Sequence, residues 1–316
     1  MRIVVVGYGS LFRGVIEGCL ASGHSVTGVL RVNKVRYSPV MNFFIDSLFP
    51  DRDKIFVNNL KLNDINVSSV NSEKFKKILV NLGADIVFVS SWCEKFQEET
   101  IKIPKIGTIN LHPSLLPKYR GPNPYAQVIK HGEKETGLTF HLMDKEYDSG
   151  AILRQKTIPI SEKETGESLR EKCALYVREE TQELLKEFDN GFITPVNQNP
   201  KLATYFPQLT LYDSILPFST ESAEQLDRRI RGLTPWLKCC VPLKNDFFMF
   251  KEYEILEGTA EKEFGEIVYN DGERVEIATL DHKIMVFRGV YPVLCLPRFL
   301  HKKYVKHFLK IGKKAV

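Results

Sequence analysis

Apolar residues in the first half of the chain follow two alternating patterns. Short continuous apolar runs, such as those at 2–7 and 84–91, are typical of strands buried on both faces of a parallel sheet. Between such runs, apolar residues recur with helical spacing, as at 11–23 and 72–83. This alternation predicts an α/β domain with a doubly wound, mostly parallel, Rossmann-like sheet over residues 1–190.

The pattern changes after a stretch rich in Pro and Asn at 191–206, which we interpret as a linker. One helix-like segment at 222–233 is followed by short β-prone runs that turn residues separate. Two of these runs flank the Asp-Gly pair at 271–272, which is a hairpin signal. Residues 207–316 are therefore predicted to form a small, OB-like β-barrel domain, whereas residues 35–75 are predicted to be largely irregular.

Composition places the chain among ordinary globular proteins. Its 316 residues are 43% hydrophobic and 26% charged, which is enough for a buried core. The net charge of +5 permits an anionic partner such as a phosphate, a folate tail or RNA. The 6 cysteines include no CxxC pair, so we expect reduced thiols, a cytoplasmic location and no metal site. No signal peptide or membrane segment is visible, so no membrane association is expected.

Glycines follow the first predicted strand at Gly7, Gly9 and Gly14. Dinucleotide-binding loops space their glycines as GxGxxG and have an acidic residue at the end of the second strand. Here the spacing is GxGxxxxG, and Arg31 stands near the expected acidic position. A nicotinamide-dependent oxidoreductase is therefore a distant alternative, because a tight strand-to-helix turn explains the glycines without a cofactor.

Asn110 and His112 are the first candidates for catalysis. Residues two apart on a strand face the same side, and these two stand at the carboxyl end of a predicted parallel strand. An Asn amide can stabilise an oxyanion and a His can exchange a proton, and acyl transfer needs both functions. The alternative is a surface Asn beside a hydrogen-bonded core His.

A turn with Asp144, Glu146 and Asp148 follows the strand that carries His141. A carboxylate from this turn would orient His112 and raise its basicity, whereas the other two acids are explained as a solvated surface. His141 is expected in the core or in a pocket wall. Because no GxSxG nucleophile is present, the attacking group is expected on the substrate, as an amine.

Several linked motifs surround these candidates in order: Asn110-x-His112, Ser114 to Pro117 (Ser-Leu-Leu-Pro), Arg120-Gly121, Glu135-Thr136-Gly137 and Asp148-Ser149-Gly150. Together they resemble the formyltransferases that use 10-formyltetrahydrofolate. The helix-like segment 222–233 and the β-rich region after it are similar to the carboxyl-terminal half of methionyl-tRNA formyltransferases and of two-domain amino-sugar N-formyltransferases.

The resemblance implies a role for each candidate. Asn110 and His112 would hold the formyl oxygen, while Asp148 would tune His112 and order a water that helps to remove the amine proton. The co-substrate would be 10-formyltetrahydrofolate, with no metal. Its binding site would comprise Val89, Ser90, Ser91, Trp92, Ser114, Leu115, Leu116, Pro117, Leu142 and Asp144.

The formyl acceptor stays open between two classes. Length, domain pair and a basic tail with Arg298 and lysines after it favour initiator methionyl-tRNA. The region 31–56 lacks the Pro-Asp-Arg-Pro loop of those enzymes, and the sequence "TFHLMD" around His141 resembles the amino-sugar enzymes, which favours a nucleotide-linked amino sugar.

The basic tail has two interpretations. It contacts RNA phosphates, or it is a solvated helix whose apolar residues Phe299, Tyr304, Phe308 and Leu309 face the β domain. A non-enzymatic RNA-binding module is a third hypothesis for the whole chain. The joint presence of the three proposed catalytic residues argues against it.

Overall fold

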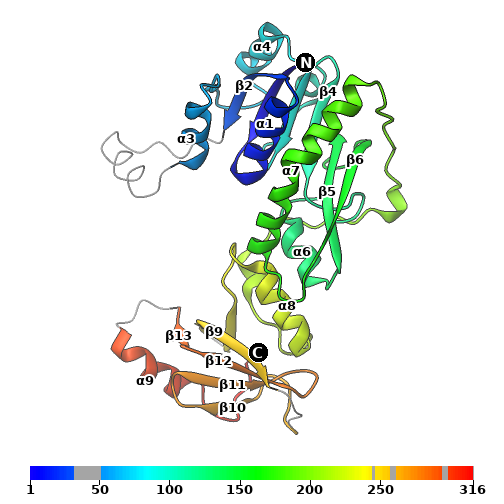
Figure 1. Ribbon diagram of the computed structural model, residues 1–316. Helices are drawn as coiled ribbons and strands as arrows, with labels where there is room; N and C mark the ends of the chain where they lie inside the picture. The colour runs from blue at the N-terminus through cyan, green and yellow to red at the C-terminus, as the bar shows by residue number, and fades with distance from the viewer. Residues whose placement is uncertain (32–50, 244–245, 257–260, 294–297, 316) are drawn as a thin grey trace. The chain divides into compact units, whose positions relative to one another are not determined.

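The computed structural model describes residues 1–31, 51–243, 246–256, 261–293 and 298–315. They separate into two compact units (Figure 1). The first unit comprises Met1–Pro124, Glu135–Pro159 and Leu169–Pro207, and the second comprises Tyr125–Lys134, Ile160–Ser168 and Gln208–Val316. Residues 191–206, interpreted above as a linker, belong to the first unit. The domain boundaries at 190 and 207 stay a prediction.

The first unit is built on one six-stranded sheet with the order β2-β1-β3-β4-β5-β6. Strands β1 to β4 pair in parallel, and β5 and β6 are antiparallel to their neighbours. The mostly parallel sheet predicted from the apolar runs is therefore confirmed. The strands are β1 (Arg2–Gly7), β2 (Ser25–Arg31), β3 (Ile86–Ser90), β4 (Gly107–His112), β5 (Glu135–Leu142) and β6 (Ile152–Pro159).

Helices of the first unit cover the sheet. They are α1 (Gly9–Ala21), α3 (Arg52–Asn59), α4 (Glu73–Leu82), α5 (Glu98–Ile101) and most of α7 (Gly166–Asp189). Helix α4 begins where the Ser72 hydroxyl accepts from the Phe75 amide, and it ends at Gly83 with φ 55°. Phe75 and Leu79 share a buried cluster with Val4 and Val6 of β1. Helix α3 was not predicted, and residues 32–50 of the expected irregular region lie outside the described residues.

The turn between β1 and α1 is closed by a side chain from α3. Asp53 Oδ2 accepts from the Gly9 amide at 2.7 Å, and its other oxygen pairs with Arg13. The carboxylate thus occupies the helix N-terminus where a dinucleotide-binding protein holds a phosphate. Gly7 is also needed structurally, because a Cβ there would lie 2.2 Å from the Ser90 carbonyl oxygen.

Two further glycines let α1 approach α7 on the same side of the sheet (Figure 1). A Cβ on Gly14 would lie 2.9 Å from Val177 Cβ. A Cβ on Gly18 would lie 2.6 Å from Thr181 Cβ and 2.7 Å from the Arg178 carbonyl oxygen. The third glycine of the GxGxxxxG pattern therefore serves helix packing.

The second unit contains α6 (Pro124–Lys130), the amino-terminal turn of α7, α8 (Ala223–Leu233) and an antiparallel β region. The strands form two sheets, with the orders β10-β11-β12-β9 and β13-β8-β7. The predicted small carboxyl-terminal β domain is confirmed and consists of antiparallel strands, and the Asp-Gly pair connects β10 to β11. The strands are β7 (Cys240–Leu243), β8 (Asp246–Met249), β9 (Glu252–Leu256), β10 (Ile267–Asn270), β11 (Arg274–Ala278), β12 (Ile284–Arg288) and β13 (Tyr291–Pro292).

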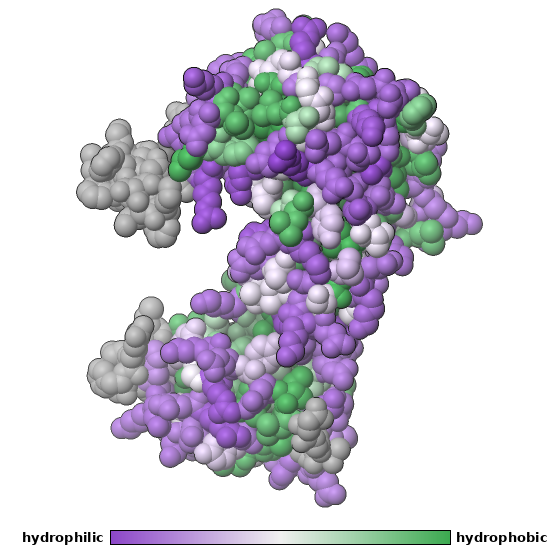
Figure 2. Space-filling model, viewed as in Figure 1, coloured by the Kyte–Doolittle hydropathy of each residue, from purple (hydrophilic) through white to green (hydrophobic). Residues whose placement is uncertain are grey.

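The basic tail forms α9 (Arg298–Phe308). Val305 and Leu309 are buried in the core of the second unit, and Tyr304 packs against it. Lys303 and Lys306 are exposed, and Figure 2 shows hydrophilic residues over this part of the unit. The Phe299 side chain lies outside the described part of the structure.

Short 3-10 helices at Pro200–Leu202 (η1) and Leu211–Ser214 (η2) complete the described elements. Within the described part of the chain, no helix is both long enough and apolar enough to span a membrane. Contact of the basic tail with RNA stays a prediction.

Replacing Gly18 by Val tests the α1–α7 contact. The added methyl groups would overlap Thr181 and the Arg178 carbonyl group, and we expect the free energy of unfolding to fall by about 1–3 kcal/mol. Urea titration followed by circular dichroism measures it. Leu20→Ala, at a 38% exposed position on the same helix, should cost less than about 0.5 kcal/mol. An unchanged unfolding midpoint in Gly18→Val would contradict the packing argument.

Candidate active site

Strand β4 places Asn110 and His112 at the carboxyl end of the parallel part of the sheet. Both side chains reach Asp148, in the turn between β5 and β6. Asn110 Nδ2 donates to Asp148 Oδ1 at 3.2 Å, and His112 Nδ1 lies 3.6 Å from the same oxygen. The structure therefore brings together the three residues that the sequence analysis placed in one site.

His112 is buried, and a backbone group orients its ring. His112 Nε2 lies 2.8 Å from the Tyr119 carbonyl oxygen, which can only accept, so Nε2 carries the proton. The 3.6 Å separation from Asp148 is longer than a hydrogen bond. Burial lowers the pKa of His112 below 6.5, although the Asp148 carboxylate and the hydrogen bond to Tyr119 oppose this shift. His112 is thus neutral at pH 7, with the unprotonated Nδ1 toward Asp148.

Asp148 has a left-handed backbone conformation, with φ 53°, which residues other than glycine rarely adopt. Its Oδ2 accepts from the Gly121 amide at 2.8 Å. Burial raises the pKa of Asp148, but the charge interaction with His112, the contact with His141 and the hydrogen bond from the Gly121 amide outweigh burial. The net pKa lies well below its usual range, so the carboxylate is ionised at neutral pH.

His141 completes this cluster. It lies opposite Asn110 in the antiparallel pairing of β4 with β5. His141 Nδ1 donates to the Leu142 carbonyl oxygen at 2.8 Å, so Nε2 is free to accept from Asn110 Nδ2 at 3.1 Å. Both hydrogen-bond contacts of the Asn110 amide nitrogen are therefore to groups of this cluster. His141 was expected in the core or in a pocket wall, and its contact with Asn110 was not predicted.

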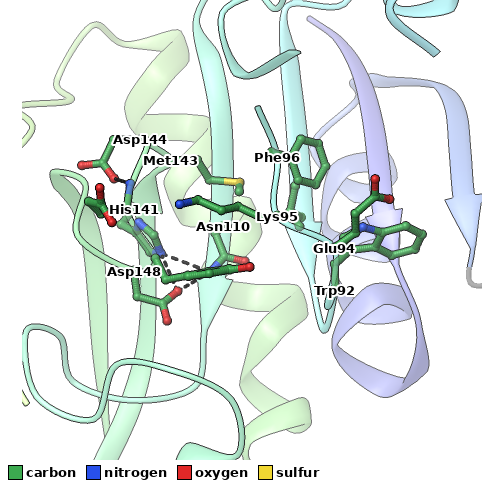
Figure 3. Close-up of a pocket in the computed structure, with 12 residues that line it drawn as sticks. Trp92, Glu94, Lys95, Phe96, Asn110, His141, Met143, Asp144 and Asp148 are labelled. Atoms are coloured by element: carbon green, nitrogen blue, oxygen red, sulfur yellow. Dashed lines mark hydrogen bonds and ion pairs between the residues drawn. The ribbon is translucent and has the colours of Figure 1, made fainter. Parts of the chain in front are cut away.

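A pocket opens beside the cluster (Figure 3). Of the residues predicted to bind folate, Val89, Trp92 and Asp144 line it, as do Asn110 and Asp148. His141 forms part of its wall, as expected. The lining residues that the sequence analysis did not single out as folate-binding are Glu94, Lys95, Phe96, Met143, Glu146 and Tyr147.

Glu94 and Lys95, two charged residues that line the pocket, make different kinds of contact. The Glu94 carboxylate accepts from the Ser69 hydroxyl and from the Val70 amide, so it holds the loop after β3 in place. Figure 3 shows Lys95 extended from this loop across the pocket. Its Nζ lies 5.2 Å from the centroid of the Tyr147 ring, which is a cation–π contact.

The other residues predicted to bind folate lie outside the described lining of this pocket: Ser90, Ser91, Ser114, Leu115, Leu116, Pro117 and Leu142. Ser114 and Leu116 instead tie their loop to β5. Thr139 Oγ1 donates to the Ser114 carbonyl oxygen at 2.6 Å and accepts from the Leu116 amide at 3.3 Å. The folate-binding role of these residues stays a prediction.

A second missed residue is Gln198, whose side chain contacts the Asp148 turn from the stretch interpreted as a linker. Its isolated position in a Pro- and Asn-rich segment offers no sequence signal. Among the described residues, no group of three or more His, Cys, Asp or Glu side chains is arranged to hold a metal ion.

Comparison with known proteins follows the two-unit organisation. Residues 1–185 match the family model described as formyl transferase, and residues 208–290 match the model of the formyl transferase C-terminal domain. The methionyl-tRNA formyltransferase of Thermotoga sp. (strain RQ2) is 31% identical over 240 residues, which cover 73% of this chain and 72% of the relative.

Two solved structures share the fold. The sugar 3N-formyl transferase WlaRD, crystallised with dTDP and 5-N-formyl-THF, superposes with a TM-score of 0.65 at 16% identity, over 94% of this chain and 99% of that one. The N-formyltransferase from Helicobacter canadensis, in complex with folinic acid and dTDP-3-aminofucose, gives a TM-score of 0.62 at 17% identity. This match covers 91% of this chain and 99% of that one. With both domain models matched in order, the chain belongs to the formyl transferase family.

Proposed function

We propose that this formyltransferase transfers the formyl group of 10-formyltetrahydrofolate to the amino group of initiator methionyl-tRNA. The observation that carries the proposed chemistry is the convergence of Asn110, His112 and Asp148 beside the pocket. The methionyl-tRNA formyltransferase relatives support the acceptor. The exposed lysines of α9 are the kind of surface that RNA phosphates contact.

The pocket suits a flat heteroaromatic ring such as a pterin. Trp92, Phe96 and Met143 give it apolar walls. The Trp92 Nε1 donor is buried without a partner among the described residues, and a polar edge of a bound ring would satisfy it. Lys95 adds a cation for an anionic folate tail. These features support folate as the formyl donor.

Asn110 is the proposed donor to the formyl oxygen. When the acceptor amine attacks the formyl carbon, that oxygen becomes an oxyanion, and a preorganised amide N–H stabilises it. The Asn110 amide nitrogen donates to His141 and Asp148. The oxyanion would replace one of these acceptors, so the amide is already oriented before the substrate binds.

His112 is the proposed proton acceptor. The attacking amine must be neutral and must lose a proton as the new C–N bond forms, while the bond from N10 of the folate to the formyl carbon breaks and N10 takes up the proton that the amine has given to His112. Neutral His112 presents Nδ1, and Asp148 lies 3.6 Å away and would stabilise the imidazolium that forms. A water between the amine and Nδ1 would relay the proton.

A nucleotide-linked amino sugar is the second candidate acceptor. His141 belongs to the sequence "TFHLMD", which resembles the amino-sugar enzymes. Its side chain lies in the site and accepts a hydrogen bond from Asn110. The 31–56 region, where the sequence departs from the methionyl-tRNA enzymes, lies mostly outside the described residues.

An acceptor screen tests the proposal. The protein is incubated with 10-formyltetrahydrofolate and either charged initiator tRNA or nucleotide-linked 3- and 4-amino sugars, and release of tetrahydrofolate is followed. We expect release with the charged tRNA and none with the sugars. Release with a sugar alone would move the assignment to the second candidate. Binding of NAD(H) without affinity for folate would contradict formyl transfer.

Removing either partner of the proposed proton-transfer pair should reduce kcat. We expect His112→Ala and Asp148→Asn each to lower kcat by about 100-fold or more, because the proton acceptor or its charge stabilisation is lost. The Tm and folate binding should stay close to those of the wild type. Glu162→Gln removes a carboxylate from an exposed position and should leave kcat unchanged. Near-wild-type turnover of either site variant would exclude that residue from the mechanism.

The protonation of His112 can be measured directly. NMR titration of the imidazole signals, assigned with His112→Asn, should give His112 a pKa below 6.5. Because the Asp148 carboxylate opposes the effect of burial, Asp148→Asn should lower this pKa further. Only neutral His112 accepts a proton, so kcat/KM should fall as pH decreases through this pKa. A His112 pKa above 6.5 in the wild type, or a higher His112 pKa in Asp148→Asn than in the wild type, would contradict the assignment of His112 as a neutral imidazole near the Asp148 carboxylate.

A further inference from the structure

Gln198 joins two loops of the proposed active site. Arg120 Nε and Nη2 donate to its Oε1 at 3.2 and 2.7 Å. Its Nε2 donates to the carbonyl oxygens of Asp148 and Gly150, both at 2.8 Å. Both ends of the side-chain amide are therefore paired, and with three different residues. Such a saturated amide fixes the position of the groups around it.

The Asp148 turn depends on outside support. A left-handed conformation at a residue other than glycine costs about 1–3 kcal/mol, and it persists only where the surroundings enforce it. Gln198 supplies donors to the carbonyls of Asp148 and Gly150, on either side of Ser149. Without these donors, the turn is expected to relax, and the Asp148 carboxylate would move away from Asn110 and Gly121.

The same segment also holds the loop that orients His112. Thr204 Oγ1 accepts from the Tyr119 amide at 2.8 Å, and the Thr204 carbonyl oxygen accepts from the Arg120 amide at 2.9 Å. The Tyr119 ring stacks on Phe206, with centroids 5.3 Å apart. Gln198, Thr204 and Phe206 thus support both the carbonyl that orients His112 and the carboxylate beside it.

We propose that Gln198 is a positioning residue for formyl transfer, which holds the Asp148 carboxylate at the distance from Asn110 and His112 that the reaction requires. This inference rests on the proposed function. Gln198 is not among the described residues that line the pocket, and its contacts lead to the site through Asp148. Its role is distinct from general support of the fold, because both hydrogen bonds that it donates end on the one turn that supplies the proposed catalytic carboxylate.

Three variants test this role. Gln198→Ala removes all the side-chain hydrogen bonds. Gln198→Glu keeps an acceptor for Arg120 but cannot donate to Asp148 and Gly150, so it isolates the bonds to the turn. Asn199→Ala is the matched control, because Asn199 is exposed in the same segment and its side chain accepts only from the nearby Lys201 amide among its described hydrogen bonds.

We expect both Gln198 variants to lower kcat by about 10- to 100-fold with little change in the KM for the formyl donor, since displaced catalytic groups slow the chemical step. Asn199→Ala should have the wild-type kcat. In an Asp148→Asn background, Gln198→Ala should change kcat by less than about twofold, because the group that it positions is already lost. Independent, multiplying effects of the two substitutions would overturn the proposal, and so would wild-type kcat in Gln198→Glu.

The NMR titration of His112 gives a second readout that needs no substrate. If Gln198 holds the carboxylate near His112, Gln198→Ala should shift the His112 pKa in the same direction as Asp148→Asn. An unshifted pKa in a folded variant would overturn the proposal. Failure of the wild-type protein to formylate any acceptor would instead count against the proposed function, and would leave the titration result to decide the role of Gln198.

Discussion

The site is organised around one buried, ionised carboxylate. A carboxylate out of water is stable only where donors and positive groups surround it. Asp148 receives such donors from separate parts of the chain, the Asn110 amide on β4 and the Gly121 amide in the loop after it, and the imidazoles of His112 and His141 lie within 3.7 Å of its Oδ1. The sheet register, the proline-containing loop and the β5–β6 turn therefore have to be correct together. A small error in any one of them would leave the charge unpaired.

The sheet and the position of Asn110 and His112 on β4 were predictable because their signals are local. Continuous apolar runs mark strands buried on both faces, and the spacing of Asn110 and His112 on one strand placed both on one side of it. Asp148 was predicted from the order of the motifs and because a His that accepts a proton needs a carboxylate to orient it. The contact of His141 with Asn110 depends on the antiparallel register of β4 and β5, which single-strand patterns do not contain.

Gln198 and α3 show where local patterns fail. A stretch rich in Pro and Asn is typical of a linker, yet residues 198–206 bond to the loop at 117–121 through backbone and side-chain groups that any exposed loop also has. Helix α3 is short and its apolar residues are few, so its periodicity is weak. In both cases the structure is decided by tertiary partners far away in the sequence.

The Asp53 carboxylate at the start of α1 has a consequence for ligand selection. A carboxylate on the same chain competes with a phosphate for the helix N-terminus as an intramolecular ligand, with an effective concentration on the order of millimolar. A nucleotide phosphate that approached the Gly9 amide would have to displace Asp53 and separate it from Arg13. A dinucleotide would therefore have to compete with Asp53 at the turn after β1, which is where other proteins of Rossmann-like architecture hold their phosphates.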